Sequence, residues 1–160
     1  MPRSIVATLA LVLFALTAAP TLAEQTRHGP EGVIMKRSAH SVEQTLDRLE
    51  SILEERDVTV FNRIDHAAGA ESIGESLRPS QVLIFGAPQM GTPLMQSNPI
   101  IGIDLPQRVL AFEDAEGLVW LVYNIPAYTA DRHDVEDRDE EIEQIANALN
   151  NLTSAAVSAE

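Results

Sequence analysis

The sequence predicts an α+β fold in which one antiparallel sheet is covered on one face by helices. Three features of the sequence support this prediction: a hairpin pattern over residues 109–124, an amphipathic helix pattern after Ser41, and a second amphipathic pattern near the C-terminus. Short runs of β-branched and aromatic residues lie between the two helix patterns. The predicted order is one strand, one helix, four strands and one helix, which is a two-layer β-α-β(4)-α arrangement.

The N-terminal region is typical of a secretory signal peptide. Arg3 precedes an apolar run over residues 5–16, and small residues follow as far as Ala23. A retained membrane anchor is the weaker alternative, because the run is about a dozen residues and a bilayer span needs roughly 20. We therefore expect removal of residues 1–23, a flexible leader over 24–31 and one domain over 32–156. The mature protein would be periplasmic or secreted, without membrane insertion.

The first strand is expected within residues 33–38, and a helix should follow it. Ser41 and Gln44 have the spacing of a capping box, in which two side chains satisfy two free backbone donors at the start of a helix. The following apolar residues recur at spacings of four, three and four, so one face of this helix is apolar. These residues are Val42, Leu46, Leu49 and Leu53.

Two strands are expected next, over residues 58–64 and 81–85, with a connector over 67–77 that holds at most a turn or two of helix. Thr92 followed by Pro93 is typical of a helix start, and the brief helix it predicts runs to Gln96, before Pro99.

The hairpin pairs residues 109–112 with residues 118–124, and Gly117 supplies the left-handed backbone of its turn. The last helix is expected to begin near Asp137, where acidic residues stabilise the positive end of the helix dipole. Its apolar face consists of Ile142, Ile145, Ala146, Leu149 and Leu152.

Composition excludes several classes of function. The formal net charge of −13 disfavours nucleic acid and anionic lipid as partners. The chain has no cysteine, which excludes disulfides, cysteine nucleophiles and thiolate metal sites. We also find no nucleophile elbow, dinucleotide fingerprint or His-Glu-x-x-His pattern, so no cofactor or metal is expected.

Four segments together resemble a known bacterial family. The first is Phe-Gly-Ala-Pro-Gln-Met-Gly-Thr-Pro-Leu-Met-Gln-Ser-Asn-Pro-Ile-Ile-Gly-Ile-Asp-Leu-Pro over residues 85–106, and the others cover 63–70, 114–128 and 132–133. They resemble the domain of unknown function 302 (DUF 302) family. This resemblance implies a fold similar to the two-layer architecture of TATA-binding-protein-like domains, and it implies self-association as a homodimer. The family has no agreed biochemical activity.

The resemblance also implies a set of candidate ligand-binding positions. Trp120 and Asn124 lie four residues apart in a strand, so they share a face, while Tyr123 points the other way. If helices leave that face uncovered, the ring and the amide suit a small polar ligand; if helices cover it, Trp120 belongs to the core. The expected site gathers the polar or amphipathic residues that caps and packing explain least. They are His66, Asn98, Asp104, Trp120, Asn124, Tyr128 and His133.

Two functions from different classes remain open. The first, which we favour, is a noncatalytic module of the cell envelope that binds a small ligand or an envelope protein. The second is a metal-binding protein or enzyme that uses His66, His133, Asp104 and Glu113 as acid, base or ligands. The two histidines would have to meet in space for the second function, which the spacing of the sequence does not decide.

Overall fold

The computed structural model describes residues 26–56 and 58–159, and it has the predicted α+β architecture. The signal peptide prediction falls outside these residues. The strands are β1 (Thr26–His28), β2 (Val33–Arg37), β3 (Thr59–Asp65), β4 (Ser80–Gly86), β5 (Gln107–Glu113) and β6 (Val119–Asn124). The helices are α2 (Val42–Glu54), α3 (His66–Glu71), α4 (Pro88–Ser97), the 3-10 helix η1 (Pro99–Ile103), α5 (Pro126–Arg132) and α6 (Asp139–Val157). None of the described helices is long and apolar enough to cross a membrane.

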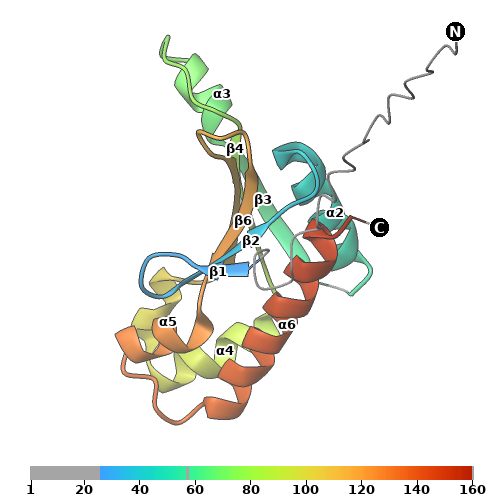
Figure 1. Cartoon of the computed structure of the whole chain (residues 1–160). Coiled ribbons are helices and arrows are strands. Elements are labelled where there is room, and N and C mark those ends of the chain that lie inside the picture. Colours follow the sequence, from blue (N-terminus) through green and yellow to red (C-terminus); the bar gives the residue numbers. More distant parts are fainter. Residues whose placement is uncertain (1–25, 57, 160) are drawn as a thin grey trace, which may run out of the picture.

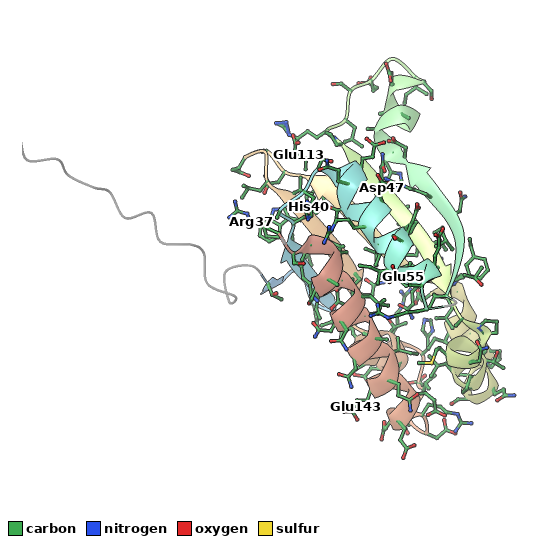
Figure 2. The ribbon with its side chains drawn as sticks, turned by 90° about the vertical axis from the view of Figure 1, so that its right-hand side faces the viewer. Arg37, His40, Asp47, Glu55, Glu113 and Glu143 are labelled. Carbon is green, nitrogen blue, oxygen red and sulfur yellow. The ribbon has the colours of Figure 1, made fainter. Side chains whose placement is uncertain are left out.

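All six strands form one antiparallel sheet in the order β1-β2-β6-β5-β4-β3. Helices α2 and α6 pack side by side on one face of this sheet (Figure 2). Helix α3 projects at one end of the sheet, whereas α4 and α5 gather at the other end with the first turns of α6 (Figure 1). The molecule therefore has two ends, the α3 end and the α4–α5 end, separated by the length of the strands.

The hydrophobic core lies between the sheet and the α2–α6 layer. Alternate residues of the central strands are fully buried on this side, among them Leu83, Val109 and Leu121. Leu46, Leu49 and Leu53 of α2 meet them, as the spacing of the sequence predicts. Ser41 and Gln44 form the capping box at the start of α2.

The hairpin between β5 and β6 also follows the prediction. Phe112 pairs with Trp120 and Val109 with Tyr123, and Gly117 has a φ of 76°, in the left-handed region that favours glycine. The Asp114 carboxylate accepts from the backbone amides of Glu116 and Leu118, which fixes the turn.

Three elements differ from the prediction. Thr26–His28 forms β1 on the edge of the sheet, although a flexible leader was expected there, because it pairs with β2. Helix α4 begins at Pro88 instead of Thr92, since Pro88 occupies the first turn and Pro93 is accommodated inside the helix. Helix α5 was not predicted, although Pro126 stands in its first turn.

Candidate functional site

A cluster of polar side chains lies at the α4–α5 end. The carboxylate of Asp104, which follows η1, is 2.6 Å from Nε2 of His133 at the end of α5. The Arg132 guanidinium approaches the same carboxylate oxygen at 3.2 Å. The His133 side chain is only 6% exposed and that of Asp104 15%, so the pair is largely removed from water.

Asn98 completes this cluster. Its side-chain amide donates to the backbone carbonyl of His133 at 2.7 Å, and its oxygen accepts from the Ile100 amide to cap η1. The neighbouring Ser97 hydroxyl donates to Asp137, and this hydrogen bond, with Arg138 nearby, lowers the pKa of the Asp137 carboxyl. These contacts join the end of α4 and η1 to the connection between α5 and α6, which is remote from them in sequence.

His66 does not belong to this cluster, contrary to the expectation of one shared site. It is the first residue of α3, at the opposite end of the sheet (Figure 1). The length of β4, roughly 20 Å at 3.3 Å per residue, separates the two ends. Glu113 also lies at the α3 end, where its backbone amide donates to the carbonyl of Pro79. The four residues of the enzyme or metal alternative therefore do not converge.

Trp120 lies on the sheet face that points away from α2 and α6. It is absent from the core that Leu121 and Tyr123 enter, yet it is only 2% exposed. Its indole N–H donates to the Asp114 carboxylate at 2.7 Å. Trp120 therefore has a structural partner in the hairpin and does not reach the Asp104–His133 cluster.

Asn124 and Tyr128 lie at the α4–α5 end but outside the cluster. Asn124 ends β6 with an exposed side chain, and Tyr128 of α5 is 43% exposed. The Tyr128 ring packs over Gly32, where any Cβ atom would overlap it. Of the seven predicted residues, the structure thus brings together three: Asn98, Asp104 and His133.

The cluster has the features of a structural junction. Each of its polar groups is engaged by a neighbour, which is how proteins satisfy buried polar side chains. Among the described residues, no group of three or more His, Asp and Glu side chains is placed to hold a metal ion.

A cavity of about 370 Å³ opens beside this junction, between the start of β3, the end of β4, helix α4 and the first half of α6. Phe85 and Leu149 belong both to its lining and to the core, and Phe61 stands at its edge with 55% of its surface exposed. The lining residues are Val58, Phe61, Phe85, Gly86, Ala87, Pro88, Met90, Gly91, Thr92, Met95, Gly102, Leu105, Pro106, Gln107, Ile145, Ala148, Leu149 and Leu152.

None of the described residues that line this cavity has an ionisable side chain. The polar side chains among them are those of Thr92 and Gln107. This part of the lining suits apolar groups and contributes no general acid, general base or metal ligand.

Most of the cavity wall comes from residues 85–107, but none of its lining residues was among the seven predicted positions. Met90 and Met95 form part of this wall, and their flexible side chains suit an irregular apolar surface. The missed signal is weak: apolar residues interspersed with glycine and proline also describe an ordinary tight connection.

The comparisons with known proteins agree with this architecture. Residues 34–152 match the family described as "Domain of unknown function DUF302". The chain belongs to the DUF302 family. This match spans β2 to α6 and includes the cavity and the polar cluster.

Two similar proteins have a more specific name. The chain is 47% identical over 102 residues to "Fluoride-specific ion channel FluC 1" of Brucella suis biovar 1 (strain 1330). It is 47% identical over the same length to the protein of that name in Brucella abortus biovar 1 (strain 9-941). Each match covers 64% of this chain but only 40% and 38% of the relatives. The chain thus spans about two fifths of the length of these curated relatives.

A solved structure supports the fold. The crystal structure of an uncharacterized conserved DUF302 protein from Bacillus stearothermophilus superposes with a TM-score of 0.64, covering 79% of this chain and 96% of that chain. The two sequences are 16% identical, so the likeness concerns the fold alone.

Proposed function

We propose that this protein is a noncatalytic binding module of the cell envelope that holds a small apolar ligand in the cavity between β4, α4 and α6. The cavity itself is the observation that supports this proposal most directly. Its volume of about 370 Å³ lies in the range of ligand pockets, which begins near 300 Å³, and its lining is mainly hydrophobic, as in such pockets.

The arrangement of ionisable groups favours binding over catalysis. The described lining residues of the cavity include no ionisable one, and the Asp104–His133 pair is closed by its own partners. A general acid or base must lie within hydrogen-bond reach of a bound substrate, and these lining residues supply neither. The apolar lining also favours an apolar ligand over the small polar ligand that the sequence suggested.

Binding of a neutral dye tests the proposal. N-phenyl-1-naphthylamine fluoresces more strongly in apolar surroundings, and we expect it to bind with saturation. Ala148 of α6 lines the cavity with an exposed side chain, so Ala148→Phe should fill the mouth and weaken binding at least about tenfold. Ala155→Phe is the matched control, because Ala155 is exposed on the same helix away from the cavity. Equal affinity in both variants, or no binding to either, would overturn the proposal.

Export is the second part of this proposal, and the pattern of Arg3, the apolar run over 5–16 and Ala23 supports it. Intact-mass measurement of the protein from the envelope fraction should give a chain beginning at or near Glu24. Cytoplasmic protein that retains Met1 would contradict it.

A second candidate function is a part in fluoride handling, and only the name of the Brucella relatives favours it. It ranks second because the described lining of the cavity includes no cationic residue and the chain is strongly acidic. A 19F NMR titration with millimolar fluoride separates the two functions. Saturable line broadening would favour fluoride handling, and unchanged lines would exclude fluoride binding by this domain.

A further inference from the structure

The two polar side chains of the cavity are available to a ligand. Neither the Thr92 hydroxyl nor the Gln107 amide makes a side-chain hydrogen bond to the rest of the described chain, and both face the cavity. Each of them can donate and accept, so they match an uncharged group such as a hydroxyl or an ester.

Apolar surface continues from the cavity along α4 and η1. Met95 lines the cavity and is 40% exposed, and its sulfur lies against Gly102, only 3.3 Å from where a Cβ atom would stand. Ile100 and Ile103, on either side of Gly102, are 66% and 69% exposed. Exposed apolar side chains that adjoin a pocket in this way mark a binding surface longer than the pocket itself.

The arginines on the α4–η1 side already have partners. Arg132 contacts Asp104, Arg138 contacts Asp137 and the carbonyl of Pro93, and Arg108 donates to the carbonyl of Ile103. Two of these three guanidinium groups already have a carboxylate partner, and an anionic group at this rim would face the negative charge of the protein. Arg56, two residues before the lining residue Val58, is exposed, and the test below therefore includes an anionic ligand.

We propose that the cavity binds an uncharged linear amphiphile, with its hydrocarbon chain in the cavity and along the α4–η1 surface and its hydroxyl or ester end at Thr92 and Gln107. This inference rests on the proposed function and narrows its ligand. A cavity of about 370 Å³ equals the volume of about a dozen waters at 30 Å³ each, which suits a chain of roughly a dozen carbons.

Displacement of the dye by ligands of equal chain length tests this class. The competitors are 1-dodecanol, kept below its solubility limit, and laurate and dodecyltrimethylammonium, each kept below its critical micelle concentration. We expect 1-dodecanol to displace the dye at a concentration about tenfold lower than either ion, because a buried unpaired charge is costly. Thr92→Val should weaken 1-dodecanol several-fold and leave the affinity for the dye unchanged.

The outcomes separate this inference from the proposed function. The proposal of an uncharged head group is wrong if laurate displaces the dye from the wild type as well as 1-dodecanol does, and displaces it less well from Arg56→Gln. If Ala148→Phe weakens dye binding but no dodecyl compound displaces the dye, the proposal of a linear hydrocarbon ligand is wrong and the proposed function still holds. Failure of the dye to bind overturns both.

Discussion

Lys36 is the one lysine of the chain, and it is buried between β2 and α6, where the described residues give it no carboxylate partner. Its ammonium lies 2.7–2.9 Å from four oxygens, which belong to Asn150, Thr153 and Ser154. Burial lowers its pKa from 10.5 to about 8. The four oxygens favour the charged form and limit the free-energy cost of this burial.

This shift predicts how stability depends on pH. Between pH 8 and 10.5 the unfolded chain holds a proton on Lys36 that the folded chain has released, so the free energy of unfolding should rise with pH across that window. The gain is lost again as pH falls through 8. Relative to Lys36→Met, urea denaturation should show the wild type gaining about 1–3 kcal/mol between pH 7 and 10. Parallel pH profiles would contradict the prediction. Burial also raises the pKa of Tyr123, and the window below pH 10 keeps the measurement on the Lys36 side of that titration.

The Asp104–His133 pair gives a second prediction at this scale. Asp104→Ala leaves the buried His133 ring without its carboxylate partner, and we expect a loss of about 1–3 kcal/mol in the free energy of unfolding. Asp131→Ala is the control, because Asp131 is exposed and should change stability by less than about 0.5 kcal/mol. Equal denaturation midpoints for the two variants would show that the pair does not support the fold.

Among the elements, those with a strong local signal were predictable. One helix was predicted from the capping box of Ser41 and Gln44 and from the four apolar residues of α2. The hairpin was predicted from its strand pattern and Gly117. Helix α5 has only seven residues and two buried positions, so its apolar periodicity is too short to read. Strand β1 depends on pairing with β2, a tertiary contact that three residues cannot encode locally.

The candidate site was less predictable because its parts come together through tertiary structure. Asn98, Asp104 and His133 meet only because η1 packs beside the end of α5. His66 follows β3 at the other end of the sheet, and its spacing in the sequence does not show at which end of the sheet it lies. The cavity is lined by residues that look like ordinary core residues in the sequence.

Two glycines with the same backbone conformation allow the cost of a left-handed backbone to be measured apart from the cost of a steric clash. Gly32 and Gly74 have φ values of 79° and 81°, but only Gly32 lies against a neighbour, the Tyr128 ring of α5. Gly74→Ala should cost about 1 kcal/mol for the left-handed backbone alone. Gly32→Ala should cost clearly more, because the turn before β2 and helix α5 must also separate. Thermal denaturation that ranks the two variants equally would contradict this.

At the scale of the whole molecule, the two faces of the sheet differ in charge as well as in cover. Asp47, Glu55 and Glu143 lie on the helical side (Figure 2). On the other face, Met35, Val122, Leu110 and Val82 lie in register across four strands and are all half-buried. Among the described side chains, the charged ones beside this apolar row are Arg37 and Arg108. Two acidic chains can approach one another here without bringing carboxylates together.

We therefore expect a homodimer in which two copies join through this uncovered face of the sheet. A two-fold contact would place the apolar row of one protomer against that of its partner and remove both from water. Leu110 stands in the middle of the row, so Leu110→Glu should bury a charge in the contact and yield monomers in light scattering at micromolar concentration. Leu77→Glu is the matched control, because Leu77 is 52% exposed beyond α3 and should leave the dimer intact. A wild-type chain that scatters as a monomer, or a dimer that Leu110→Glu leaves unchanged, would show that this face is not the contact.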